Sequence, residues 1–253
     1  MPSEERHRII LNILENKGSV LVTELVSQFK VSEMTIRRDL VTLEHKRLLR
    51  RVHGGAVSDR GRSYEPPFLS RSTLGQEEKA RIGKLTAELI HSGDSIALDV
   101  GTTTLEIARN LVEKQNLTVI TPCFPIASLL CDNPSIRLIL TGGILRPTEL
   151  SMIGHLAERV FEEFYVDKLI LAAAGIDFET GLTEYNLEDT LVKRAMIRHA
   201  KQVILVADAT KFNRVAFTAI APVDVVNTVV TDKSIDPSIV AKLQELNIDV
   251  LLA

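Results

Sequence analysis

Seven short apolar runs in the later part of this 253-residue chain restrict its fold more than any other feature. They are SIALDV (95–100), LTVIT (117–121), RLILT (137–141), KLILAAAG (168–175), QVILVAD (202–208), TVVT (228–231) and DVLLA (249–253). Helical stretches such as LEIARNLVEK, HLAERVFEEF, LEDTLVKRAMIRHA and PSIVAKLQEL lie between most of them. Because the runs are apolar throughout and do not alternate, they indicate strands covered on both faces. The sequence therefore predicts an α/β domain with a largely parallel sheet.

The first part of the chain differs from this region in charge. Residues 1–62 hold 12 Lys and Arg against 8 Asp and Glu, a balance of +4, whereas the remainder balances at −7. Between them, SDRGRSYEPPFLSRSTLGQ (58–76) is polar, carries two adjacent prolines and lacks periodicity, which is typical of a linker. We therefore expect a small basic module over 1–57, a linker over 58–75 and an acidic body over 76–253.

The basic module carries three helix signals in close succession. Residues placed to cap the three helices are Ser3, Thr23 and Ser32. Apolar positions recur at helical spacing in each segment: Ile9, Ile10, Ile13 and Leu14, then Leu25, Val26 and Phe29, then Ile36, Leu40 and Leu43. Because so few residues separate the second helix from the third, the pattern is typical of a helix-turn-helix.

Burial of the third helix's apolar stripe turns its other side toward solvent. The residues expected on that side or at its N-terminal cap are Ser32, Glu33, Met34, Thr35, Arg37, Arg38 and Val41. A helix N-terminus attracts phosphate, and an arginine can hydrogen-bond a guanine edge through two N–H groups in the major groove. These residues therefore indicate a DNA-reading surface; the alternative is that the two arginines merely solvate an amphipathic helix.

The segment RLLRRVHGGAV (47–57) favours the DNA interpretation. It predicts two short strands joined by a turn at Gly54 and Gly55, with Arg50, Arg51 and His53 near the tip. A basic hairpin beside a recognition helix is a wing, and such a wing suits the phosphate backbone or the minor groove. The module is thus expected to be a winged helix-turn-helix.

These residues resemble the signature of a known family. FKVSEMTIRRDLVTLEHKRLLRRVHGGAV, with the first helix and VTEL ahead of it, is similar to the DeoR family of bacterial transcription regulators. The body resembles the sensor domain of the same family, whose fold is similar to ribose-5-phosphate isomerase and CoA transferases. The resemblance implies operator DNA and a phosphorylated sugar or sugar acid as partners, and a homodimer or homotetramer. One departure is Lys46 and Arg47, where the family commonly has a glycine.

Polar residues at the carboxyl ends of the expected strands are candidate ligand contacts, because ligands of parallel α/β sheets bind at that edge. At the first end, Asp99 precedes Gly101, Thr102, Thr103 and Thr104, which open a helix. Backbone N–H groups and hydroxyls at a helix N-terminus favour a phosphate monoester. The alternative is that these threonines only cap the helix.

Three further strand ends add candidates. The second gives Gly142 and Gly143, which let a backbone approach the ligand, and Arg146, which either meets ligand charge or is solvated. The third gives Asp177 and Glu184. The fourth gives Asp208 and Lys211, a pair suited to sugar hydroxyls and phosphate. The resemblance places Asp99, Gly101 to Thr104, Gly142, Gly143, Asp208 and Lys211 on motifs associated with effector binding.

The helix after the third strand end has a structural interpretation. Asp189 and Lys193 are spaced as an i,i+4 pair, and we interpret Asp189 and Arg194 as parts of a solvated, salt-bridged helix surface. Cys123 and Cys131 have no cysteine or histidine at metal-ligand spacing, so both are expected to be reduced core thiols. We expect no metal and no cofactor.

Two functions from different classes fit these features. The leading hypothesis is a non-enzymatic repressor of a sugar or sugar-acid catabolic operon that a phosphorylated metabolite releases, and activation would use the same contacts. The alternative is a sugar-phosphate isomerase-like enzyme, although an isomerase does not need the basic module. Because the chain has a charged N-terminus and lacks an apolar run of roughly 18 residues, no membrane association and a cytoplasmic location are expected.

Overall fold

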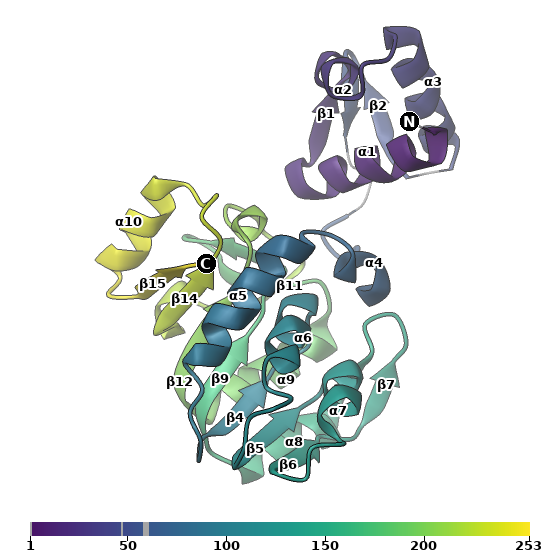
Figure 1. Ribbon diagram of the computed structural model, residues 1–253. Helices are drawn as coiled ribbons and strands as arrows, with labels where there is room; N and C mark the ends of the chain where they lie inside the picture. Colours follow the sequence, from purple (N-terminus) through teal and green to yellow (C-terminus); the bar gives the residue numbers. More distant parts are fainter. Residues whose placement is uncertain (1, 47, 58–60) are drawn as a thin grey trace. The chain divides into compact units, whose positions relative to one another are not determined.

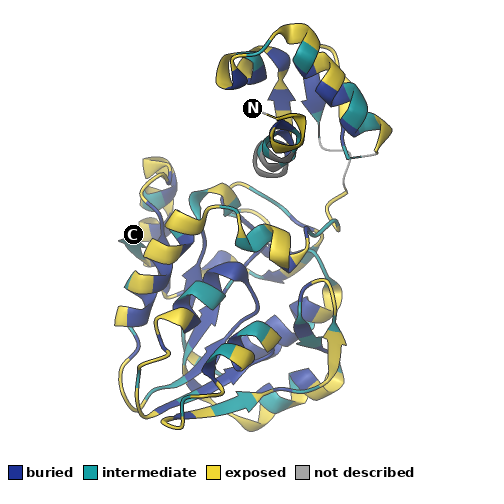
Figure 2. Cartoon of the chain, turned by 45° about the vertical axis from the view of Figure 1, so that its right-hand side comes forward, coloured by how far each residue is buried: buried dark blue, intermediate teal, exposed yellow. Residues whose placement is uncertain are grey.

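The computed structural model describes residues 2–46, 48–57 and 61–253, which divide into two compact units (Figure 1). The first unit runs from Met1 to Tyr64 and the second from Glu65 to Ala253. Figure 2 shows buried residues concentrated inside each unit and exposed residues on the outer helix faces. Each unit therefore has its own hydrophobic core, as expected for a separate domain.

The first unit is a winged helix-turn-helix, which confirms the prediction for the basic module. Its elements are α1 (Ser3–Lys17), β1 (Ser19–Leu21), α2 (Val22–Phe29), α3 (Glu33–His45), β2 (Arg50–Val52) and β3 (Gly55–Val57). The strands form an antiparallel sheet in the order β1-β3-β2. The predicted stripe of Ile36, Leu40 and Leu43 is fully buried on α3 and packs with Ile10 and Leu25 of the other two helices.

Only one of the three expected helix caps is present. The Ser32 side chain accepts a hydrogen bond from the Thr35 backbone N–H at 3.2 Å. Ser3 is instead the first residue of α1, and neither α1 nor α2 has a capping side-chain hydrogen bond. Helix α2 begins at Val22, before Thr23, and the Val22 N–H bonds to the Gly54 carbonyl. The expected cap at Thr23 is therefore wrong because pairing to the wing already satisfies the start of the helix.

The wing turns one residue earlier than expected. Strand β3 begins at Gly55, so the turn consists of His53 and Gly54, and Gly54 has a φ of 85°. Gly55 is needed for another reason: a Cβ atom there would lie 2.0 Å from the Val20 carbonyl oxygen on β1. The second glycine therefore serves close strand pairing and not the turn. Arg47, where the family resemblance is broken, lies outside the described residues.

The second unit is built on a seven-stranded parallel sheet, as predicted. Its strands are β4 (Ser95–Leu98), β5 (Leu117–Thr121), β6 (Ile136–Leu140), β9 (Val166–Leu171), β12 (Ala200–Val206), β14 (Thr228–Thr231) and β15 (Asp249–Leu252). Their order across the sheet is β15-β14-β12-β9-β4-β5-β6, and every neighbouring pair is parallel. The seven apolar runs are therefore the seven strands of one sheet.

Helices cover both faces of this sheet (Figure 1). One layer contains α5 (Gln76–Glu88), α6 (Thr102–Arg109) and α7 (Phe124–Leu130), and the other contains α8 (His155–Glu163), α9 (Leu187–Arg198) and α10 (Pro237–Glu245). Side chains alternate between the layers along each strand: on β9, Leu169 and Leu171 belong to one core and Ile170 to the other. Burial on both faces explains why the strand sequences are apolar throughout.

Smaller elements lie in the connections between the strands of this sheet and were not predicted. They are the hairpin β7 (Ile144–Arg146) with β8 (Ser151–Ile153), the antiparallel sheet of β10 (Gly175–Asp177), β11 (Gly181–Glu184) and β13 (Thr218–Ala221), and the short helical turns η1 (Ala209–Lys211) and η2 (Val223–Val225). Of the two cysteines, Cys123 is buried as expected but Cys131 is exposed. The expectation that Cys131 is a core thiol is wrong, because Cys131 follows the last residue of α7 and is exposed to solvent.

The second half of the stretch expected to be a linker is folded into the second unit. Helix α4 (Phe68–Ser72) lies within it, and Phe68 is only 2% exposed, packed into the core that contains α5 and α6. The Phe68 N–H also bonds to the Thr148 carbonyl. Residues 65–75 thus belong to the second unit. Their polar, proline-rich composition did not indicate that the Phe68 side chain is buried. Residues 58–60 lie outside the described part of the chain.

Candidate DNA-binding surface and ligand pocket

Helix α3 presents a polar, exposed face at its N-terminal end. Met34 is 74% exposed, and Glu33, Arg37 and Arg38 are also exposed. The Ser32 and Thr35 hydroxyls lie 2.9 Å apart beside the first free backbone N–H groups of the helix. Hydroxyls, N–H groups and guanidinium groups therefore share the end of the helix that a helix-turn-helix presents to the major groove.

The two adjacent arginines of this face differ in their surroundings. Arg37 donates through Nε to Glu33 at 3.0 Å, an i,i+4 pair on the solvent side. The Arg38 side chain makes no hydrogen bond or ion pair with any residue that the structure describes. Arg38 is therefore available to a base edge, whereas Arg37 must first exchange its carboxylate partner.

Arg51 of the wing is held by Glu44 of α3. Arg51 donates through Nε to Glu44 at 2.7 Å, and its backbone N–H donates to the same carboxylate at 2.8 Å. These bonds hold β2 against the last turn of α3, and they lower the pKa of Glu44. Arg50 and His53 are exposed on the same hairpin.

A buried ion pair under the recognition helix was missed by sequence reasoning. Asp39 is 5% exposed and accepts hydrogen bonds from Arg6 Nε at 2.8 Å and from His7 Nε2 at 3.0 Å, so it ties α1 to α3. The signal was present in the sequence: an acid that falls between Ile36 and Leu40 on the inward face must find a buried partner.

In the second unit, a lysine joins two of the predicted carboxylates. Lys193 of α9 is 1% exposed; its ammonium forms an ion pair with Asp99 at the end of β4 and lies 3.2 Å from Glu184 of β11. Burial disfavours the Lys193 cation, yet Asp99 and Glu184 raise its pKa above the ordinary value. Asp99 also accepts the Ala172 N–H at 2.9 Å, so this cluster ties β4, β9, β11 and α9 together.

The threonine cluster starts α6 beside this group. Thr102, Thr103 and Thr104 are all buried, and the Thr104 hydroxyl donates to the Gly101 carbonyl at 2.9 Å. Helix α6 has no capping side-chain hydrogen bond, because the Thr104 hydroxyl donates to a carbonyl and does not accept from a free N–H. Helices α4 and α5 both contact α6, which brings the side chains of the preceding segment to the same edge of the sheet.

Four cations influence one another at this edge. Burial lowers the pKa of Lys211, the charges of Arg71 and Arg214 lower it further, and Asp208 opposes them. Burial also lowers the pKa of Lys79 to about 8, with Asp208 opposing and Lys211 and Arg71 adding to the decrease. Throughout the described ranges, the Lys211 ammonium has no hydrogen bond and no ion pair. These four cations therefore lie close enough to affect one another's ionisation, and sequence reasoning found only Lys211 of the four.

Two arginines and three carboxylates form a second, adjoining network. Arg146 pairs with Glu65 and, at 2.7 Å, with Asp189; Arg71 pairs with Glu149 and lies 3.6 Å from Glu65. Burial raises the pKa of Asp189 to about 6, with the charge of Arg146 opposing. The interpretation of Asp189 as a solvated helix surface is therefore wrong, because it is 4% exposed and pairs with the β7 arginine.

The neighbouring basic residue on α9 also differs from its interpretation. Arg194 donates to the Ala219 and Ile220 carbonyls of β13, so it fastens the small sheet to α9 and does not belong to a salt-bridged surface.

Two other predicted site residues, Asp177 and Gly143, have roles in the local backbone structure. Asp177 accepts hydrogen bonds from the N–H and hydroxyl of Thr180 at 2.9 and 3.0 Å, which closes the turn between β10 and β11 and lowers its pKa. At Gly143, with φ 108°, a Cβ atom would lie 2.5 Å from the Ile153 carbonyl oxygen. The close approach at Gly143 is therefore to β8, while a Cβ atom on Gly142 would meet nothing within 4 Å.

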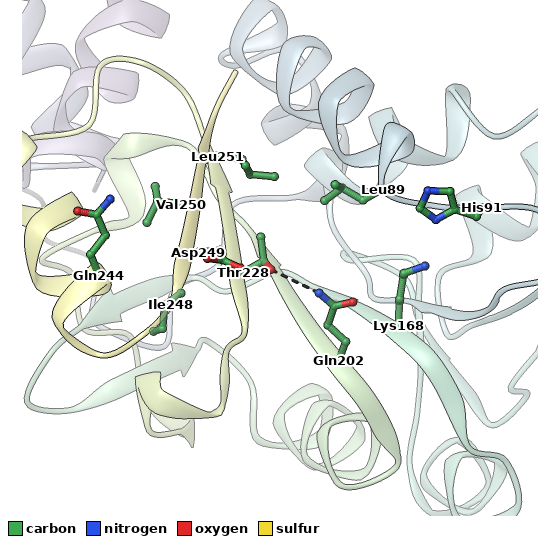
Figure 3. A pocket seen from close by; sticks show the side chains of 10 residues that line it. All are labelled: Leu89, His91, Lys168, Gln202, Thr228, Gln244, Ile248, Asp249, Val250 and Leu251. Carbon is green, nitrogen blue, oxygen red and sulfur yellow. Dashed lines mark hydrogen bonds between the residues drawn. The ribbon is translucent and has the colours of Figure 1, made fainter.

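A cavity of about 540 Å³ lies at the opposite edge of the sheet (Figure 3). It is lined by Lys168, Gln202, Thr228 and Asp249, which stand at or near the amino ends of their strands, and by Gln244 of α10. Gln202 donates a hydrogen bond to the Thr228 hydroxyl of the neighbouring strand at 3.5 Å. None of the predicted site residues lines this cavity.

Every helix among the described residues is too short or too polar to span a lipid bilayer. Within the same ranges, no group of three or more His, Cys, Asp or Glu side chains is arranged to hold a metal ion.

A winged helix-turn-helix joined to an α/β domain with a charged strand-edge site defines a DNA-binding regulator with a sensing domain. Family models bear this out: the DeoR-like helix-turn-helix domain matches residues 6–62, and the DeoR C-terminal sensor domain matches residues 75–233. The chain belongs to the DeoR family of transcriptional regulators.

Relatives over the full length agree with this assignment. The chain is 38% identical to an uncharacterized HTH-type transcriptional regulator, YulB, of Bacillus subtilis (strain 168), over 97% of this chain and 95% of that protein. It is 34% identical to the glycerol-3-phosphate regulon repressor of Escherichia coli (strain K12), over 100% of each chain. Both are named regulators and not enzymes, so the isomerase interpretation is not retained.

Among solved structures, the chain is similar to ribose 5-phosphate isomerase A of Methanocaldococcus jannaschii, with a TM-score of 0.41 and 17% identity over 54% of each chain.

Proposed function

We propose that this protein is a repressor that holds operator DNA and is released by a phosphorylated sugar or sugar acid. One observation carries the choice of ligand: the Lys211 ammonium is partly buried, has no ion-pair partner in the described chain, and stands among Arg71, Lys79 and Arg214 at the carboxyl edge of the sheet. Cations whose charged forms are disfavoured by burial and by one another gain most from a bound dianion.

The carboxylates of the same edge supply the other half of the recognition. Asp208 and the cluster of Asp99 with Glu184 lie beside the cations, and a carboxylate accepts hydrogen bonds from sugar hydroxyls. Thr102 and Thr103 add hydroxyls at the start of α6. A small polyhydroxylated molecule with one phosphate group matches this combination. The name of the E. coli relative, a glycerol-3-phosphate regulon repressor, supports the same chemical class.

Repression requires that two recognition helices engage one operator. We propose a homodimer or homotetramer whose paired wings read half-sites separated by roughly 10 base pairs or a multiple of that spacing. The effector must bind one arrangement of the wings more tightly than the other, because a ligand with equal affinity for both shifts nothing. By linkage, operator DNA then weakens effector binding to the same degree.

Fluorescence anisotropy on DNA from upstream of the protein's own transcription unit tests this proposal. At fixed salt, tight binding that one phosphorylated sugar or sugar acid releases, and that its unphosphorylated form does not, is expected. Lys211→Ala should still bind DNA but lose the release, whereas Lys84→Ala, at an exposed lysine of α5, should behave as wild type. Binding without preference over random DNA, or normal release of Lys211→Ala, would contradict the proposal.

A further inference from the structure

Glu65 has an unusual place for a charged residue. It is the first residue of the second unit, directly after Tyr64 at the end of the DNA-binding unit, and its side chain is 9% exposed. It forms ion pairs with Arg146 and, at 3.6 Å, with Arg71. The entry point of the chain into the sensor domain is therefore fastened by two guanidinium groups.

Arg71 belongs both to this fastening and to the cation cluster of the pocket. Its Nε donates to the Pro66 carbonyl at 3.1 Å, and its guanidinium forms an ion pair with Glu149. Its charge also acts on the neighbouring lysines, Lys79 and Lys211. Lys79 in turn donates to the Arg71 and Leu74 carbonyls at 2.6 and 2.5 Å, which ties α4 to α5.

The network around the two arginines is not fully satisfied. In the described part of the chain, two buried side-chain atoms of this network lack a hydrogen-bond partner, Arg146 Nε and Glu149 Oε2. Three carboxylates share two arginines, so the carboxylates compete with one another. Such a network exchanges a partner at lower cost than a fully hydrogen-bonded one.

We propose that Glu65 is an internal competitor of the effector, and that the effector's phosphate displaces Glu65 from Arg71 and Arg146. A phosphate accepts the paired N–H groups of a guanidinium as a carboxylate does, and it carries more charge. Its arrival frees the Glu65–Pro67 segment that leads from the DNA-binding unit. This inference rests on the proposed function and deepens it, because it names the contact through which ligand binding reaches the wing.

The experiment uses inorganic phosphate as the probe and the full-length protein. Apparent phosphate affinity is measured by thermal shift at constant ionic strength for wild type and for Glu65→Gln, Lys211→Ala and Glu77→Gln, the last at an exposed carboxylate of α5. Because Glu65→Gln removes the competing charge, it should bind phosphate roughly fivefold more tightly or better. Lys211→Ala should bind more weakly, and Glu77→Gln should match wild type.

A second readout follows the segment itself. Trypsin cleavage after Arg62, identified by mass, should accelerate with phosphate in wild type and should be fast without phosphate in Glu65→Gln. If Glu65→Gln binds phosphate no better than wild type while Lys211→Ala binds more weakly, the competitor role is overturned and the pocket stands. If Lys211→Ala does not weaken binding, or wild type binds no phosphate, the pocket assignment fails and the competitor role fails with it.

Discussion

The charged residues of the two units solve opposite problems. On α3, Arg37 and Arg38 are exposed, and water screens their charges, so neither needs an internal partner to fold. In the sensor unit, Lys193 and Arg146 are removed from water and are paired with carboxylates from distant parts of the chain. The exposed arginines therefore need no internal partner, whereas Lys193 and Arg146 are balanced by buried carboxylates.

The largest effect is expected where that internal balance is broken. Lys193→Met keeps the length of the side chain but leaves Asp99 and Glu184 as uncompensated buried carboxylates, which should cost about 3–5 kcal/mol in the free energy of unfolding. Urea unfolding measures this cost. Lys84→Met, at an exposed α5 lysine, should change stability by less than about 0.5 kcal/mol. A cost for Lys193→Met as small as that of the control would show that the cluster is not held by its lysine.

The second prediction sharpens the comparison on the exposed side. Arg38→Ala should cost about 1–3 kcal/mol in binding to the operator and relax specificity at one base pair. Arg37→Ala should cost less, because Arg37 must give up Glu33 before it reaches DNA. Arg51→Ala should weaken all DNA alike and reduce the salt slope by about one. Anisotropy titrations over a salt series, on operator and on random DNA, separate these outcomes, and equal behaviour of the three variants would remove the distinction.

Features that depend on local sequence could be predicted well. The Ser32 cap, the stripe of Ile36, Leu40 and Leu43, and the seven apolar strands depend on nearest neighbours and on periodicity, so they could be predicted. The strand-edge principle also identified Asp99, Glu184 and Lys211 as polar ends without any knowledge of how they are joined.

The buried ion pairs of the second unit depend on long-range contacts that periodicity does not encode. The Arg146–Glu65 contact spans 81 positions, Arg71–Glu149 spans 78 and Lys193–Asp99 spans 94. Arg71 lies in a stretch whose composition is that of a linker, and the burial of Phe68 shows that this stretch is folded onto the second unit. A charge on the inward face of a helix, as at Asp189 and Lys193, is the local sign of such a contact, and spacing alone made it look like a surface pair.

The smallest effect is expected at Lys79, a buried lysine whose pKa is lowered by burial to about 8. Bound phosphate favours the charged form of Lys79, so the affinity for phosphate should fall as the pH rises through 8, by less than about tenfold per pH unit for the loss of one proton. The ligand for this titration should be a phosphate monoester, measured between pH 7.5 and about 9.5, where its charge is nearly constant because its second pKa is about 6.

The matched variant separates Lys79 from its neighbour. Lys79→Gln should bind phosphate more weakly at pH 7.5 and show a flatter decline above pH 8. Lys211, whose pKa is also lowered, contributes to the decline in both proteins, so the difference between the two profiles reports Lys79 alone. Parallel profiles would mean that Lys79 carries no charge that the ligand senses, and that its two hydrogen bonds to the Arg71 and Leu74 carbonyls are its whole role.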